Sequence, residues 1–194
     1  IFYYLTLRIF FNLFGYTSEN GRIFSLIFYF LSFVSIYYFS RFTFNKSQSI
    51  LLASFYFSTP FILWMSNETR VDMFLVFFSL INLIIFFKAY SLGNKKNKFL
   101  LCLVNIVTLS VYPLTFSLLI SQALFSFIKK KYDLVLIIII SFFIYALVNY
   151  EYILVKSITK GHHYASLESS FFIGYFFNKF FGSVFFGLIY LISC

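Results

Sequence analysis

Long apolar stretches, separated by short polar segments, dominate this chain. A helix needs about 20 mostly apolar residues to cross the hydrocarbon core of a bilayer. The stretches that approach or exceed this length are 23–40, 48–65, 73–90, 99–128 and 134–153. Backbone groups in lipid must find partners within the protein, and a helix meets that need by itself. The pattern therefore predicts an all-α fold, a polytopic transmembrane helical bundle.

Two of these stretches contain a proline, which removes a backbone donor and interrupts a helix. Pro60 lies near the far end of 48–65, where we expect a kink or a helix end. The stretch 99–128 is too long for one ordinary span, and Pro113 lies near its middle. We expect two short helices that form a hairpin there. One long tilted helix is the alternative.

The remaining apolar segments differ from full spans. The segment 1–14 is short and carries Arg8, which predicts an interfacial helix on the outer face. A second interfacial helix is expected over 171–181, and 182–194 begins a last span. The first residue is not Met, and the last apolar run ends with the chain. We therefore expect a single transmembrane domain, 1–194, that is truncated at both ends.

Composition supports a membrane location and gives the orientation. Hydrophobic residues make up 61% of the chain and charged residues only 11%, whereas soluble domains are about 25% charged. The net charge of +9 could suggest a nucleic-acid partner. However, the basic residues cluster in the short loops 41–47, 93–98 and 129–131, which is typical of a cytoplasmic face. We predict contact with membrane lipids and no nucleic-acid partner.

The opposite face comprises 1–22, 66–72 and 154–182, and it collects most of the acidic residues. Five of the six acids lie in these segments or at the adjoining end of the span 134–153, namely Glu19, Glu68, Asp72, Glu151 and Glu168. Both histidines also lie on that side. We expect any chemistry on this outer face.

Residues 67–72 read NETRVD and hold the densest charge on that face. Glu68 and Asp72 are four residues apart, so on a helix they would share one face. Two carboxylates beside Arg70 could bind a phosphate-bearing substrate, a metal ion or a sugar hydroxyl. The alternative, which the spacing alone favours, is a solvated helix cap with a snorkelling Arg70.

Two further groups of polar residues are weaker candidates for a functional role. Glu19 and Arg22 form a second charged pair on the outer face, although Ser18 or Glu19 could simply cap the next helix. His162 and His163 are adjacent and would point in different directions on a helix, so they would chelate a metal poorly. They lack the companion ligands of a zinc site, and we name no metal ligand.

An ordered series of short motifs runs through the first half of the chain. The motifs are FYYL at 2–5, FG at 14–15, SE at 18–19, RIFS at 22–25, STPF at 58–61 and ExRxD at 68–72. This series resembles the GT-C membrane glycosyltransferases, in the part that follows their catalytic first extramembrane loop. The branches implied are the dolichyl-phosphate-mannose protein mannosyltransferases and the bacterial lipopolysaccharide sugar transferases.

The resemblance implies transfer of a sugar from a polyprenyl-phosphate carrier to a lipid, glycan or protein acceptor. Transfer would invert the sugar linkage on the periplasmic or lumenal side of the bacterial inner membrane or endoplasmic reticulum. The family's general base lies in the first loop, which we expect upstream of this sequence. Asp72 and Glu68 are then the candidate catalytic acids, as orienting groups. The candidate substrate-binding residues are Arg22, Arg70, Glu19 and His163. The resemblance also allows a divalent metal ion as a cofactor, because some members of the family use one.

Two other classes of function compete with a transferase. The first is a polytopic membrane transporter or lipid flippase subunit, and the second is a structural or assembly subunit. A transporter should hold charges or paired broken helices near the middle of the membrane. Here the span interiors have almost no ionisable residues, and the charges gather on one face. That distribution favours chemistry at the membrane surface over a path across it.

Overall fold

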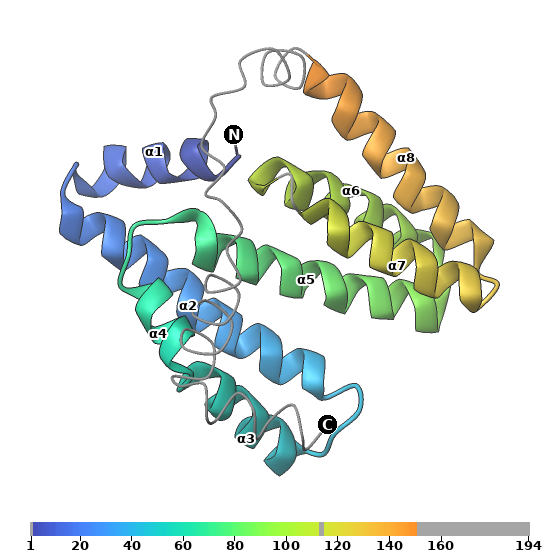
Figure 1. Ribbon diagram of the computed structural model, residues 1–194, viewed down its shortest axis with the longest axis horizontal. Coiled ribbons are helices and arrows are strands. Elements are labelled where there is room, and N and C mark those ends of the chain that lie inside the picture. The colour runs from blue at the N-terminus through green and yellow to red at the C-terminus, as the bar shows by residue number, and fades with distance from the viewer. Residues whose placement is uncertain (1, 113–114, 151–194) are drawn as a thin grey trace, which may run out of the picture.

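The computed structural model describes residues 2–112 and 115–150, which fold into helices joined by short turns (Figure 1). Within those residues the helices are α1 (Phe2–Phe14), α2 (Ser18–Ser40), α3 (Lys46–Phe57), α4 (Pro60–Ser66), α5 (Val71–Leu92), α6 (Lys95–Val111), α7 (Phe116–Ile128) and α8 (Tyr132–Val148). The expected helix 171–181, the last span 182–194 and the loop with both histidines lie outside the described residues. The described part is all-α, as predicted.

Two of these helices are long and apolar enough to cross a membrane. They are α2, with 23 residues, and α5, with 22 residues. They correspond to the predicted spans 23–40 and 73–90. Helices α1, α7 and α8 are apolar but shorter. The first helix therefore agrees with the expectation of a short segment rather than a full span.

Local capping explains where the helices begin and end. The Thr17 hydroxyl accepts a hydrogen bond from the Asn20 backbone N–H at 3.1 Å, so α2 begins at Ser18. Neither Ser18 nor Glu19 is the cap, since both lie in the first turn of the helix. Asn94 caps α6 in the same way, which brings the first lysines of the expected basic loop into that helix. Gly93 ends α5 at φ 62°, a left-handed conformation that glycine adopts without strain.

Both expected proline breaks are present. The stretch 48–65 is divided at Ser58 and Thr59, and Pro60 starts α4. Proline is well tolerated there, because the first backbone N–H of a helix has no partner within the helix. Helix α6 ends where Tyr112, the residue before a proline, adopts an extended conformation. Two helices thus cover 99–128, and the single tilted helix is wrong.

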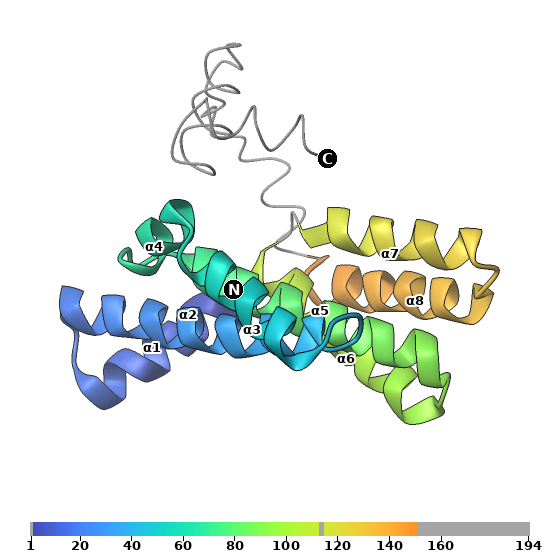
Figure 2. The same cartoon turned by 90° about the horizontal axis from the view of Figure 1, so that it is seen from below.

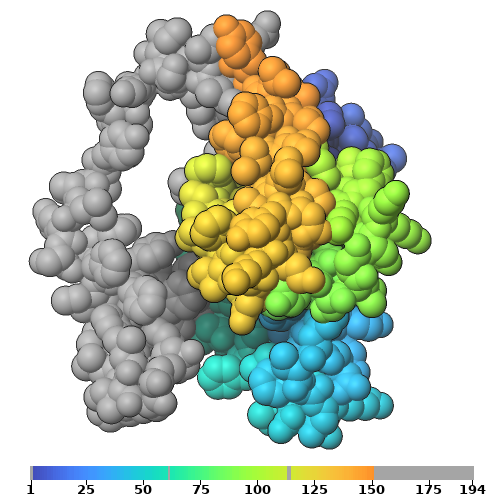
Figure 3. Space-filling model, turned by 90° about the vertical axis from the view of Figure 1, so that its right-hand side faces the viewer, coloured from blue at the N-terminus to red at the C-terminus, as the bar shows by residue number. Residues whose placement is uncertain are grey.

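Helix α5 is central in the arrangement and packs between α2 and α6 (Figure 1). Helix α8 covers α6 and α7, while α3 packs along α2. Figure 2 shows α1 and the beginning of α2 at the opposite end of the molecule from the turn between α7 and α8. In Figure 3 the side chains of α6, α7 and α8 pack together, and those of α2 and α3 lie below them.

The turns between helices separate into two groups in Figure 1. Those after α2, α5 and α7 lie toward the lower right, and the clustered basic residues lie in these turns or in the first turns of the helices that follow them. The turn between α1 and α2 and the connection from α4 to α5 lie toward the upper left. The structure thereby separates the basic loops from the NETRVD segment, as the charge distribution predicted.

Buried amides connect α5 to its neighbours. Asn82 Nδ2 donates to Asn105 Oδ1 at 2.8 Å, and Gln122 Nε2 donates to Asn82 Oδ1 at 2.5 Å. Asn105 Nδ2 donates in turn to Ser141 Oγ at 3.3 Å. These contacts join α5, α6, α7 and α8 through uncharged groups. This network therefore gives no support to a charged path across the membrane.

Candidate active site

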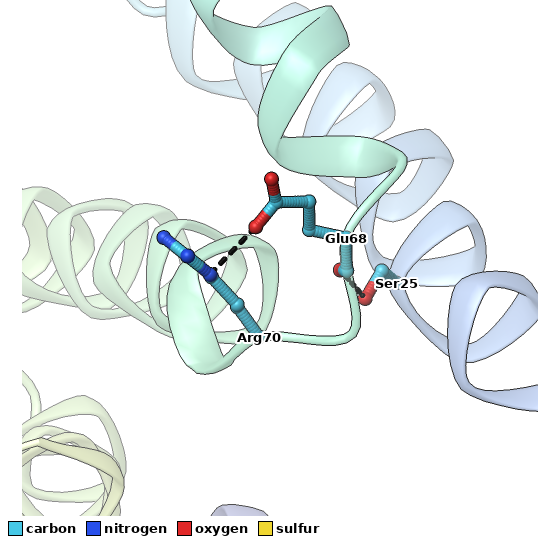
Figure 4. Close-up of polar contacts among 3 residues, drawn as sticks. All are labelled: Ser25, Glu68 and Arg70. Carbon is cyan, nitrogen blue, oxygen red and sulfur yellow. Dashed lines mark hydrogen bonds and ion pairs between the residues drawn. The ribbon is translucent and has the colours of Figure 1, made fainter. Parts of the chain in front are cut away.

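The loop between α4 and α5 packs directly on the beginning of α2. Ser25 Oγ donates a hydrogen bond to the Glu68 carbonyl oxygen at 2.7 Å (Figure 4). One turn earlier, Gly21 faces Thr69 so closely that a Cβ on Gly21 would overlap the Thr69 side chain. The two polar segments that the sequence singled out, SENGR and NETRVD, are therefore in contact. A glycine at position 21 makes this approach possible.

The side chains of Glu68 and Arg70 form an ion pair. Arg70 Nε lies 2.6 Å from Glu68 Oε2 (Figure 4). The Arg70 guanidinium also lies over the Trp64 ring, at 5.5 Å from its centroid. The Arg70 side chain remains 57% exposed. Arg70 is thus oriented by a carboxylate and a ring, while its terminal donors face outward.

Asp72 lies in the first turn of α5 and is half-buried. A carboxylate is stabilised there by the positive end of the helix dipole. Asp72 interacts electrostatically with Arg70 and Glu68. No described residue donates a hydrogen bond to its side chain or forms an ion pair with it. The Asp72 carboxylate is therefore close to charged partners yet remains available for a ligand.

Tyr3 lies beside this group, although the sequence pattern did not single it out. Its ring contacts Phe24 on α2 and Phe74 on α5, with centroid separations of 6.0 and 5.6 Å. The residue is only 3% exposed, and its buried hydroxyl has no hydrogen-bond partner among the described residues. Burial, with smaller contributions from Tyr4 and Asp72, raises the pKa of Tyr3 to about 12. Tyr3 is therefore a protonated donor at any physiological pH.

The other sequence-based candidates are less closely connected to this group. Arg22 follows Gly21 on α2 and is exposed, as is Glu19 in the first turn. Within the described part of the chain neither forms an ion pair, so the expected Glu19–Arg22 pair is not made. His163 lies outside the described residues. The structure thus joins Glu68, Arg70 and Asp72, and leaves Arg22 and Glu19 as nearby surface charges.

The described residues contain no group of three His, Cys, Asp or Glu side chains able to hold a metal ion. Glu68 and Asp72 are two carboxylates, and one of them is already paired with Arg70. What these residues offer chemically is an outward-facing guanidinium beside a half-buried carboxylate. A guanidinium suits a phosphate, and a carboxylate suits a hydroxyl.

No curated protein and no solved structure is significantly similar to the chain. The family model described as dolichyl-phosphate-mannose-protein mannosyltransferase matches residues 1–148, which include every helix described above. Members of that family are integral membrane proteins. The chain therefore belongs to the dolichyl-phosphate-mannose-protein mannosyltransferases, a family of GT-C glycosyltransferases.

Proposed function

We propose that this protein transfers mannose from a polyprenyl-phosphate carrier to an acceptor hydroxyl on the periplasmic or lumenal face, with inversion. Membership of the family makes the protein a polyprenyl-phosphate-sugar-dependent glycosyltransferase. The observation that carries the finer proposal is the Glu68–Arg70 ion pair beside the Asp72 carboxylate, which has no ion-pair partner among the described residues. Support for the face comes from the basic turns, which lie away from this group (Figure 1).

Arg70 is suited to bind the phosphate of the sugar donor. Its Nε is held by Glu68 at 2.6 Å, which orients the guanidinium and leaves the two terminal nitrogens as donors. Paired N–H groups match the geometry of phosphate oxygens. When the sugar leaves, negative charge increases on the phosphate, and a guanidinium already in place stabilises it. Glu68 is then an orienting group for Arg70.

Asp72 is suited to orient the acceptor. In the proposed reaction the acceptor oxygen forms a bond to the anomeric carbon of mannose, on the side opposite the phosphate. The bond from that carbon to the phosphate oxygen breaks, and its electron pair leaves with the polyprenyl phosphate. The hydroxyl proton passes to the Asp72 carboxylate, the group that accepts the hydrogen bond of this hydroxyl. Asp72, half-buried at the start of α5, accepts a hydrogen bond from this hydroxyl and directs its lone pair at the carbon.

The test uses the full-length protein in proteoliposomes with radiolabelled dolichyl-phosphate-mannose and total membrane acceptors. We expect Arg70→Ala and Asp72→Asn each to lower transfer by at least about tenfold, since removing one preorganised charge-stabilising group usually costs more than that. Lys96→Ala, an exposed residue in the first turn of α6, is the matched control and should transfer at the wild-type rate. Wild-type transfer by both site variants would refute the proposal.

A further inference from the structure

Two basic segments of the described fold meet at one end of the molecule (Figure 1 and Figure 2). They are residues 93–98, after α5, and 129–131, after α7. Lys98 Nζ lies 2.6 Å from Asp133 Oδ2, and this ion pair joins the start of α6 to the start of α8. Lys131 Nζ lies 5.9 Å from the centroid of the Tyr90 ring, which joins the second segment to α5. The two segments therefore form one surface.

The contacts show which lysines share this surface. Lys98 faces α8, because its ion-pair partner lies on that helix. Lys95 lies three residues earlier and shares that face of α6, whereas Lys96, two residues earlier, does not. The second segment adds three exposed lysines. We define the lysine surface as Lys95, Lys129, Lys130 and Lys131.

The positive charge of the lysine surface is not neutralised within the described part of the chain. Asp133 is already paired with Lys98. No described carboxylate forms an ion pair with a lysine of the lysine surface. Like charges held side by side repel each other, and an anion bound among them removes that repulsion. The preference of cations for cytoplasmic loops explains lysines in each segment, but it does not require the two segments to be joined.

The backbone at Lys130 is a second unusual feature of this surface. Its φ is 55°, the only positive value at a non-glycine residue among those that the structure describes. Glycine is the usual residue in this left-handed conformation at the end of a helix, and other residues adopt it at a cost in stability. Residues in such conformations cluster at functional sites. A lysine at this position therefore points to a use for its charge.

Exposed apolar side chains lie next to the lysine surface in the sequence and in the fold. Phe127 and Ile128 end α7, Tyr132 starts α8, and all three are exposed. The rings of Phe127 and Tyr132 are 5.9 Å apart between centroids. In an integral membrane family, exposed apolar groups at helix ends contact lipid. A ligand at this place would meet cations and apolar groups together, a combination that suits a phospholipid better than a free phosphate.

We propose that the lysine surface binds the headgroup phosphate of an anionic phospholipid, with the acyl chains against Phe127, Ile128 and Tyr132. The lysine ammonium groups donate hydrogen bonds to the phosphate oxygens. Basic pockets between transmembrane helices are known to bind anionic headgroups on the cytoplasmic side of membranes. The lysine surface lies on the side that the charge distribution predicts to be cytoplasmic, away from the NETRVD segment. The inference is therefore independent of the proposed function.

The test titrates the full-length protein in detergent with phosphatidylglycerol or with phosphatidylcholine and measures bound lipid by native mass spectrometry. The wild type should bind phosphatidylglycerol more tightly. Each lysine beside the headgroup should contribute about fivefold in affinity, so Lys129→Gln combined with Lys131→Gln should lower the affinity about 25-fold. The matched control combines Lys46→Gln with Lys96→Gln. It removes two exposed lysines from the same side of the molecule and should bind phosphatidylglycerol like the wild type.

Lys130→Gly separates a binding role from a structural one. Glycine removes the cost of the left-handed conformation, so the thermal midpoint of unfolding should rise. Loss of the charge should lower the affinity for phosphatidylglycerol about fivefold. If Lys130 serves only the turn, the affinity will stay at the wild-type value, which would contradict the inference.

Equal losses of affinity in the two pairs of substitutions would also overturn it, because the attraction would then be a diffuse property of the basic side. Equal wild-type affinities for the two lipids would have the same consequence. So would full competition by glycerol 1-phosphate at the lipid concentration, since that molecule carries the phosphate without acyl chains. None of these results bears on Arg70→Ala or Asp72→Asn, so the two proposals can fail separately.

Discussion

Replacing Gly21 with alanine should force the 67–70 loop away from α2. A Cβ at this position would overlap the Thr69 side chain and lie 3.0 Å from Thr69 Cβ. Neither Gly21 nor the 67–70 loop can move freely. Gly21 lies inside α2, and the loop is held by the hydrogen bond from Ser25 Oγ to the Glu68 carbonyl oxygen. The added methyl group must therefore displace the segment that carries the Glu68–Arg70 ion pair.

Two opposing effects set the size of the change. Overpacking at a tight contact costs about 1–3 kcal/mol. Alanine is favoured over glycine within a helix by about 1 kcal/mol. The free energy of unfolding of Gly21→Ala should therefore fall by about 1 kcal/mol. The rate of mannose transfer should fall by more than this loss of stability alone would cause. The reason is that displacement of the 67–70 loop also moves Arg70 and Asp72.

The assay combines thermal unfolding in detergent with mannose transfer by the full-length protein. Thr69→Ala removes the Thr69 atoms that would lie closest to the new methyl group. In the Gly21→Ala background it should recover both stability and transfer, while having little effect in the wild type. The reasoning is refuted if Gly21→Ala is as stable and active as the wild type. It is also refuted if the two substitutions act independently.

Two further predictions concern the bundle and its orientation. Asn82→Ala should lower the free energy of unfolding of the bundle by about 1–3 kcal/mol. The substitution removes the hydrogen-bond partner that Asn105 and Gln122 share. Each buried side-chain hydrogen bond in a membrane protein contributes about 0.6–2 kcal/mol. An unchanged unfolding midpoint in detergent would contradict this. Single cysteines at Tyr16 and Lys96, in a cysteine-free background, should react with an impermeant thiol reagent from opposite sides of the membrane. Labelling of both from one side would contradict the topology.

The sequence alone determined where the helices lie and where they break. Helix boundaries depend on neighbouring residues, so local signals were sufficient. Pro60 marks the division of one apolar stretch, and an extended Tyr112 before a proline marks the other. Motif order likewise pointed to the family that the comparison then showed. Caps were harder to assign, because Thr17, Ser18 and Glu19 are all suitable and only the backbone geometry selects Thr17.

Tertiary structure alone decided which charged residues meet. Spacing predicted that Glu68, Arg70 and Asp72 are neighbours, but it could not show that Glu68 pairs with Arg70. Nor could it show that Arg22 is exposed although Gly21 beside it is buried. These outcomes depend on which face of α2 the 67–70 loop covers. That face is set by the close approach of Gly21 to Thr69, a contact between segments far apart in the sequence.

Tyr3 shows most clearly what the pattern could not determine. Tyr3 is one of 16 tyrosines, and it lies in a short apolar helix where an aromatic residue is ordinary. Its burial arises only because Phe24, Phe74 and Val111 converge on it from three helices. Whether the Tyr3 hydroxyl finds a hydrogen-bond partner depends on how those helices pack. The helical pattern of α1 alone does not determine that packing. Local sequence therefore specified the helices, and long-range packing specified the unpaired groups between them.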